Sequence, residues 1–290
     1  MRVFIADNGV VGADTWKKYG ADLLISYAFK DRCIKRFNEG FKIFLDSGAF
    51  SVWKRGESID IKQYKDFCLK YQDQIEFAAN LDVIPGSWGH VPTHKDIELS
   101  AQKSFQNYLY LKDSLKCKVV PVFHQHESVE WLDKILTEID NDDLVAISPA
   151  NDQVRESRIQ WLDTIWSKMI NINREPTVNC HAFGVTTPKI IKRYPWYSVD
   201  SSTPSQHAAN GSVITYNKTG DIKAHSVSRR RTEPYSKELL SEIDRFGFRL
   251  QDLCGGQNGR NRVIYNTLVL VELLQSIATN KFTVQQETLI

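Results

Sequence analysis

Long hydrophobic runs, closely spaced cysteines and a large excess of one charge are all absent from this 290-residue sequence. No apolar stretch approaches the roughly 18 residues that a membrane span requires. Residues 1–7 turn polar too soon for a signal peptide. We therefore expect no contact with a membrane and a cytoplasmic location.

The five cysteines form no CxxC or CxC motif, and their number is odd. This arrangement argues against a disulfide framework and against a structural zinc site. We expect free thiols, no resident metal and no other cofactor. The formal net charge of +2 neither requires nor excludes a nucleic-acid partner, so only local basic clusters can argue for one.

Short β-rich runs alternate with amphipathic stretches over most of the chain. Three stretches, residues 60–71, 97–115 and 129–139, have helical spacing. Strands that alternate with helices predict βαβ units and a parallel sheet. About eight strands in a chain of this length fit a (β/α)8 TIM-like barrel, and a doubly wound open sheet is the alternative. The predicted strands are Leu23–Tyr27, Lys42–Asp46, Phe77–Asp82, Lys118–His124, Leu144–Ser148, Thr177–Gly184, Tyr197–Ser201 and, as an eighth candidate, Ser212–Tyr216.

Polar residues end nearly every predicted strand, as Asp46, Asp82, His124, Ser148 and Asp200 illustrate. In a barrel the carboxyl ends of all strands meet at one mouth, where active sites lie. Six strands with polar ends favour the barrel over the open sheet. They also predict that the functional site lies at this mouth.

The last part of the chain has a different pattern. It contains a basic stretch, a predicted helix over Ser236–Phe246, a glycine-rich turn at residues 255–259 and a long apolar helix over Arg262–Ala278. We expect one barrel domain over residues 1–290. Residues 220–290 would form a basic loop and a C-terminal helical extension packed on the barrel, with no zinc subdomain.

Two aspartates at strand ends, Asp46 and Asp200, are candidates for catalysis, and a helix cap is the structural alternative for each. The presence of two such residues at one mouth strengthens the case for a catalytic role of both, because paired carboxylates suit a glycosyl-type displacement. One carboxylate attacks the anomeric carbon, and the other moves a proton. Asp82 adds a third carboxylate, an acceptor for the N–H groups of a ligand.

Histidines near the same strand ends leave a second function class open. His124, His126 and His181 would bind a metal together with Asp46 or Asp200, as in a metal-dependent hydrolase. Hydrogen-bonding residues at the mouth are the alternative. Because His124 and His126 flank Gln125, only one of the two can readily face inward.

Aromatic and basic residues near these positions indicate ligands of two further kinds. Phe50, Phe123, Phe183 and Trp196 would sandwich a flat heterocycle, although core packing explains any one of them alone. A basic cluster would grip phosphates at the mouth, and a solvated loop is its alternative. The cluster consists of Lys223, Arg229, Arg230 and Arg231.

The order of these motifs resembles the tRNA-guanine transglycosylase superfamily. The likeness covers roughly residues 43–205, and its most specific pieces are Asp46–Ser51 and residues 184–200. The motifs are Asp-Ser-Gly-Ala-Phe-Ser, Leu-Asp-Val, Pro-Val-Phe-His-Gln, His-Ala-Phe-Gly-Val-Thr-Thr-Pro and Ser-Val-Asp-Ser-Ser. Their spacing is similar to the shorter branch that acts on DNA, the DpdA-like enzymes of bacteria and phages. Those enzymes exchange guanine for a 7-deazaguanine base.

The resemblance implies a role for each matching residue. Asp200 matches the nucleophile that attacks C1′ and holds the covalent glycosyl intermediate. Asp46 matches the general acid/base that takes the proton from the incoming base, and Asp82 matches the carboxylate that binds the guanine-like edge. Phe50 and Phe183 would form the two walls of the base pocket.

The remaining candidates complete the predicted substrate-binding surface. His124 or Gln125 falls near the family's base-contacting glutamine, and Ser148 falls where a glycine-rich segment presents backbone groups to the base. We also assign Ser47, His181 and Gly184 to this surface. The metal-dependent hydrolase and a catalytically inactive nucleic-acid-binding module remain the alternatives.

Departures from the tRNA-modifying branch bear on the expected substrate. The chain lacks that branch's C-terminal cluster of cysteines and a histidine, and it is shorter. These differences favour DNA as the partner, with tRNA as the alternative, and a base such as preQ0 as the second substrate. A homodimer is a further partner that the resemblance allows. If a phage encodes the chain, the expected location is the cytoplasm of the host.

Overall fold

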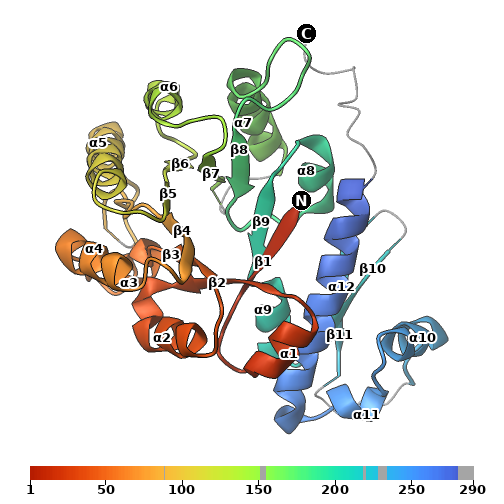
Figure 1. Cartoon of the computed structure of the whole chain (residues 1–290). Coiled ribbons are helices and arrows are strands. Elements are labelled where there is room, and N and C mark those ends of the chain that lie inside the picture. The colour runs from red at the N-terminus through yellow and green to blue at the C-terminus, as the bar shows by residue number, and fades with distance from the viewer. Residues whose placement is uncertain (88, 151–154, 218–219, 228–233, 280–290) are drawn as a thin grey trace.

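The computed structural model describes residues 1–87, 89–150, 155–217, 220–227 and 234–279. Within these residues, nine short parallel strands surround one axis (Figure 1). They are β1 (Arg2–Ala6), β2 (Asp22–Ser26), β3 (Ile43–Asp46), β4 (Ile75–Ala79), β5 (Lys118–Val120), β6 (Val122–His124), β7 (Leu144–Ser148), β8 (Asn179–Ala182) and β9 (Ser198–Ser201).

The barrel closes through one strand that is interrupted by a proline. Strands β5 and β6 are two halves of a single run separated by Pro121, and β5 pairs with β4 whereas β6 pairs with β7. The backbone N–H of Val122 has no partner in the strand ladder at this interruption. It donates a hydrogen bond to the buried side chain of Asn80 at 2.9 Å instead. Counted this way the barrel has eight strands, so the predicted (β/α)8 fold is confirmed.

The eighth strand is not the one that the sequence pattern indicated. Strand β1 pairs with both β2 and β9, and its residues Val3, Phe4 and Ile5 are buried. The predicted candidate, β10 (Ser212–Tyr216), instead pairs antiparallel with β11 (Ile222–Ser226) outside the barrel. The prediction was wrong here because both segments have strand-like sequences, and only the pairing partner distinguishes them.

Helices surround the barrel (Figure 1). The three helices predicted from periodicity are present as α4 (Ile61–Lys70), α5 (His94–Lys112) and α6 (Val129–Glu138). Helix α5 begins earlier than predicted, because Thr93 and Asp96 form a capping box at its start. The helices between barrel strands are α1 (Ala13–Lys18), α2 (Lys30–Asn38), α3 (Ala49–Trp53), α4 (Ile61–Lys70), α5 (His94–Lys112), α6 (Val129–Glu138), α7 (Arg155–Lys168) and α8 (Pro188–Arg193), with a 3₁₀ turn, η1 (Tyr27–Phe29).

The C-terminal part packs on the outside of the barrel. The long helix α12 (Gly259–Thr279) lies against α8, α9 and β10. The other elements of this part are α9 (Thr203–Ala209), α10 (Lys237–Arg245), α11 (Leu250–Leu253) and η2 (Gly256–Asn258). No helix of the described residues is long and apolar enough to cross a membrane.

Two apolar layers fix the barrel and leave its mouth for polar groups. One layer lies between strands and helices, and the other fills the barrel interior with Phe4, Phe44, Phe77 and their neighbours. Because the interior is filled by side chains, a ligand reaches the strands only from an end. A functional site is therefore expected at the end of the barrel where polar and ionisable side chains gather.

Candidate active site

Three aspartates from neighbouring parts of the barrel meet at the carboxyl end of the strands. Asp46 ends β3, Asp82 follows β4, and Asp200 lies in β9. Burial, followed by the negative charges of Asp82 and then Asp200, raises the pKa of Asp46 to about 7. The three carboxylates therefore share one electrostatic site, as the sequence predicted.

The turn after β3 holds Asp46 in place. The hydroxyl of Ser26 and the backbone of Gly48 hydrogen-bond to Asp46 and partly offset the effect of burial on its pKa. Gly48 has a φ of 78°, and a Cβ atom there would lie 2.7 Å from Ser26 Oγ and 2.8 Å from the backbone nitrogen of Ala28. Glycine is thus required for the loops after β2 and β3 to pack this closely.

Neither candidate aspartate serves as a helix cap. The N-cap of α3 is Gly48 and the N-cap of α9 is Ser202, and neither helix has a side-chain capping hydrogen bond. Asp46 and Asp200 therefore do not have the helix-capping role that was the structural alternative for each. Both carboxylates are left for other partners at the mouth.

Asp82 is held as an ionised acceptor. Ser47 Oγ donates a hydrogen bond to Asp82 Oδ1 at 2.6 Å, and Nε2 of His124 lies 3.1 Å from Asp82 Oδ2. Burial alone would raise the pKa of Asp82, but its contacts with His124 and Ser47 lower it. Burial would likewise lower the pKa of His124, but Asp82 and the carboxylate of Glu127 raise it.

Asp200 is anchored through one of its two oxygens. The backbone N–H of Gly184 donates a hydrogen bond to Asp200 Oδ1 at 2.7 Å, and Nε2 of His181 lies 3.4 Å from the same oxygen. Within the described part of the chain, Oδ2 has no such contact. The two contacts therefore orient the carboxylate through Oδ1 alone.

His181 lies beneath Asp200 and has no exposed side-chain surface. Its Nδ1 is 2.9 Å from Ser198 Oγ, and its ring packs against Phe44 and Phe183 at centroid distances of 4.8 and 4.7 Å. The ring is therefore fixed from several sides. In this arrangement His181 affects a ligand through Asp200, whereas the sequence analysis predicted direct contact.

Two other predicted residues connect the loops of the mouth. The backbone N–H of Ala150 donates to Gln125 Oε1, and the backbone N–H of Gln125 donates to the carbonyl of Ser148, both at 3.0 Å. Phe50, by contrast, is half exposed on α3 and stacks on Trp53 with an interplanar angle of 24°. Lys54 Nζ also lies 4.4 Å from the centroid of the Phe50 ring, so neighbours on its own helix and at the end of that helix already contact the ring.

The predicted basic cluster and the metal alternative are placed less favourably. Lys223 is exposed on β11, outside the barrel, and Arg229, Arg230 and Arg231 lie outside the described residues. His126 is exposed as well. Across the described ranges, no three His, Cys, Asp or Glu side chains are arranged to bind a metal ion. His124 and His181 instead contact different aspartates.

Sequence analysis overlooked two polar groups at the mouth, Asp7 and Ser26. Asp7 follows β1 and forms a fully buried ion pair with Arg36, Oδ2 to Nε, at 2.8 Å. Its other oxygen accepts hydrogen bonds from the backbone N–H of Gly9 and the indole N–H of Trp16, and these partners suit a structural role. Both residues come at or just after the end of an apolar run. The same pattern identified the candidates at the later strands, but it was not applied to the first two strands.

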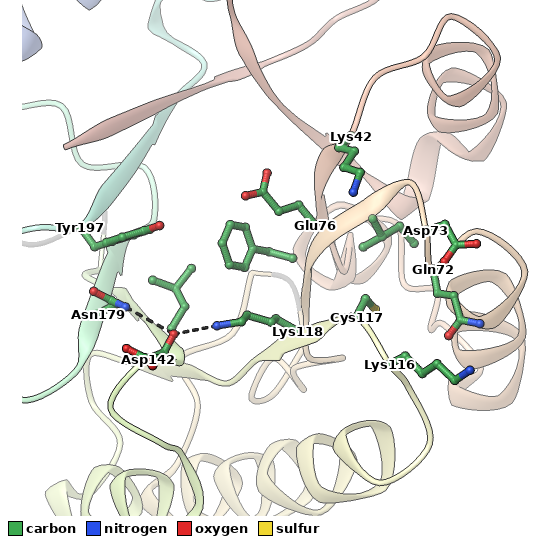
Figure 2. A pocket seen from close by; sticks show the side chains of 13 residues that line it. Lys42, Gln72, Asp73, Glu76, Lys116, Cys117, Lys118, Asp142, Asn179 and Tyr197 are labelled. Carbon is green, nitrogen blue, oxygen red and sulfur yellow. Dashed lines mark hydrogen bonds between the residues drawn. The ribbon is translucent and has the colours of Figure 1, made fainter.

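The opposite end of the barrel contains a cavity of about 500 Å³ (Figure 2). Lys42, Glu76, Lys118, Asn179 and Tyr197 are among the residues that line it. The side chains of Lys118 and Asn179 both donate hydrogen bonds to the backbone carbonyl of Asp142. None of the predicted site residues that the structure describes lines this cavity.

Comparisons with known proteins identify no family. No family model matches the chain, and no curated protein is similar to it in sequence. Among solved structures, the chain is similar to a D-psicose 3-epimerase from Clostridium cellulolyticum H10 with D-tagatose, with 9% identity and a TM-score of 0.47. The similarity covers 96% of this chain and 99% of that chain. A match at this level says nothing about the reaction.

Proposed function

We propose that the protein is a nucleic-acid guanine transglycosylase, which exchanges guanine for a 7-deazaguanine base such as preQ0 in DNA. The observation that carries the proposal is the unequal state of three carboxylates at one mouth. Asp46 has a pKa near neutrality, Asp82 is an ionised acceptor beside His124, and Asp200 has one anchored and one available oxygen. Base exchange needs one proton carrier, one recognition group and one nucleophile.

The first half of the exchange uses Asp200 and Asp46. Oδ2 of Asp200 attacks C1′ of the target nucleotide as the C1′–N9 bond breaks, which forms a covalent glycosyl ester. The leaving guanine takes up a proton at N9 from the neutral carboxyl group of Asp46. The transition state resembles an oxocarbenium ion, which the adjacent carboxylate stabilises.

The second half reverses these steps with a different base. The incoming 7-deazaguanine loses its N9 proton to the carboxylate of Asp46, and its nitrogen attacks C1′ and releases Asp200. Each displacement inverts C1′, so the two displacements together retain its configuration. A pKa near the working pH suits Asp46 to both tasks, since the group must give and take the proton once in each cycle.

Asp82 suits the recognition of guanine-like bases. Guanine and 7-deazaguanine present N–H donors on one edge, and an ionised carboxylate offers acceptors only. Ser47 and His124 contact the two oxygens of Asp82 from the protein side. They keep the carboxylate charged and oriented, with its remaining lone pairs available to the base.

Trapping of the covalent intermediate tests the proposal. Wild-type protein is incubated with guanine-containing single-stranded DNA or with tRNA, and the products are analysed by denaturing electrophoresis and mass spectrometry. We expect a protein–nucleic acid adduct at Asp200. Asp200→Asn should lose the adduct and slow base exchange by on the order of 10⁴-fold or more.

The two substrates and a control variant make this experiment decisive. An adduct with DNA but not with tRNA would support the DNA assignment, and the reverse would identify the RNA-modifying alternative. Asp244→Asn, on the outer helix α10, is the matched control and should form the adduct normally. Exchange of labelled guanine by Asp200→Asn at the wild-type rate would contradict the mechanism.

A further inference from the structure

The loops after β1 and β2 present an exposed apolar and basic surface beside the aspartates. This surface, the β1–β2 rim, consists of Val10, Phe29, Lys30 and Arg32. Val10 is 50% exposed and Phe29 is 47% exposed. Such large apolar side chains in exposed positions at an active-site mouth are typical of a binding surface.

The cations of the rim are organised around aromatic rings. The guanidinium of Arg32 lies 4.5 Å from the centroid of the Phe29 ring, and Lys30 Nζ lies 5.1 Å from that of Tyr27. Arg32 also donates a hydrogen bond to the backbone carbonyl of Asp7 at 2.8 Å, which ties the two loops together. The rim is therefore a braced surface and not a set of unrelated exposed side chains.

The strand order places this surface between the two proposed catalytic aspartates. Around the barrel the order is β3, β2, β1 and β9, so the loops after β2 and β1 lie between the strands that carry Asp46 and Asp200. The backbone nitrogen of Ala28, one residue before Phe29, also packs closely against Gly48, two residues after Asp46. A chain that enters the mouth along this arc passes over the rim.

We infer that the β1–β2 rim binds the nucleotides that flank the target base in a single-stranded polynucleotide. The inference rests on the proposed function, because it concerns the partner of the same site. An exposed ring stacks on any base, and neighbouring cations attract the phosphates. In residues 27–32, the two cations Lys30 and Arg32 outnumber the single carboxylate, Asp31. A protein partner would meet the same apolar surface but would not depend on salt in the same way.

A binding assay with matched variants tests the inference. Fluorescence anisotropy would measure binding of labelled single-stranded DNA and of RNA with the same sequence, about 12 nucleotides long, to the Asp200→Asn chain, in which no adduct forms. Phe29→Ala and Lys30→Ala are compared with Tyr19→Ala and Lys18→Ala. Tyr19 is 40% exposed and Lys18 Nζ lies 5.4 Å from its ring, but Lys18 ends α1 and Tyr19 follows it, before β2 and at the amino end of the barrel.

We expect Phe29→Ala to weaken binding by about tenfold and Tyr19→Ala to leave it unchanged. Lys30→Ala should lower the slope of log affinity against log salt concentration by about 1, and Lys18→Ala should not. Phe29→Leu keeps the apolar volume but removes the aromatic face, so it should weaken binding as well. Thermal unfolding of each variant shows whether it is folded.

Equal affinities of the Phe29, Lys30 and control variants would overturn the inference and assign the rim to a protein partner. Loss of binding by the Tyr19 control as well would also overturn it. The failures of the two proposals are distinguishable. A wild-type chain that binds through Phe29 but never exchanges a base contradicts only the proposed function. Base exchange with unchanged affinity in Phe29→Ala contradicts only the rim.

Discussion

At the amino end of the barrel, Arg2 pairs with Asp22 and Glu76 at 2.8 and 2.5 Å. At the carboxyl end, by contrast, no Lys or Arg of the described ranges lies within ion-pair distance of Asp46 or Asp200. The amino end has a cavity of about 500 Å³, and Glu76, which lines it, is paired with Arg2. The cavity and the cluster of aspartates proposed to be catalytic therefore lie at opposite ends of the same fold.

This difference has a physical origin in the burial of like charges. Asp46 is buried near two other carboxylates, so its ionised form is destabilised and its pKa rises to about 7. The carboxylates of Asp22 and Glu76 instead lie beside the guanidinium of Arg2, whose positive charge compensates theirs. The comparison supports the proposal that the chemistry takes place at the carboxyl end, with a structural role for the ion pairs of the amino end.

The largest effect in the predictions that follow is expected for Asp46→Asn. Asparagine cannot give or take the proton, so base exchange should slow by about 10²–10⁴-fold. In the wild type, single-turnover formation of the adduct should fall as pH rises through about 7, because only the neutral carboxyl group of Asp46 protonates the leaving guanine. Quenched-flow measurement between pH 5.5 and 8.5 covers this range, and a flat wild-type profile would contradict the role.

The same variant has a readout that needs no substrate. Because the folded-state pKa of Asp46 is raised from 3.8 to about 7, its ionisation costs stability, which is lost progressively as pH rises from about 4 to 7. Asp46→Asn should therefore be more stable than wild type at pH 8 by about 2–4 kcal/mol and similar at pH 4. Urea unfolding at the two pH values measures this difference.

A smaller effect is expected for His181→Phe. Phenylalanine fits the aromatic surroundings of His181 but leaves Asp200 Oδ1 with the N–H of Gly184 alone. Misorientation of the nucleophile should lower kcat by about 10²-fold and leave KM unchanged, as steady-state kinetics would show. His181→Gln, which keeps a polar side chain beside Asp200, should recover part of the rate. A change confined to KM would instead support the predicted contact with the substrate.

No effect on exchange is expected for Glu76→Gln at the amino end. The substitution weakens a partly exposed ion pair with Arg2, so it should lower the free energy of unfolding by about 1 kcal/mol or less. Base exchange and chemical denaturation of the same preparation measure both quantities. A large loss of exchange without a loss of stability would place the active site at the amino-end cavity and reverse the comparison.

Much of the fold and of the site could be predicted from the sequence. The alternation of strand and helix patterns predicted the barrel, and polar residues at strand ends predicted that Asp46, Asp82 and Asp200 would meet. Strand β1 was missed because its five residues have no preceding helix to mark the alternation. The pattern at Ser212–Tyr216 was assigned to the barrel because a strand sequence does not specify its pairing partner.

The partners of each carboxylate could not be predicted. The contact of His124 with Asp82 joins residues 42 positions apart, and that of His181 with Asp200 depends on the register of β8 against β9. The sequence by itself determined the reactive groups and the end of the barrel at which they lie, because side-chain periodicity and parallel strands are local properties. Only the tertiary structure decided which carboxylate has a raised pKa, which has a lowered pKa and which oxygen of Asp200 is hydrogen-bonded. Those properties depend on burial and on neighbouring charges, and the chain brings them together only when the barrel closes.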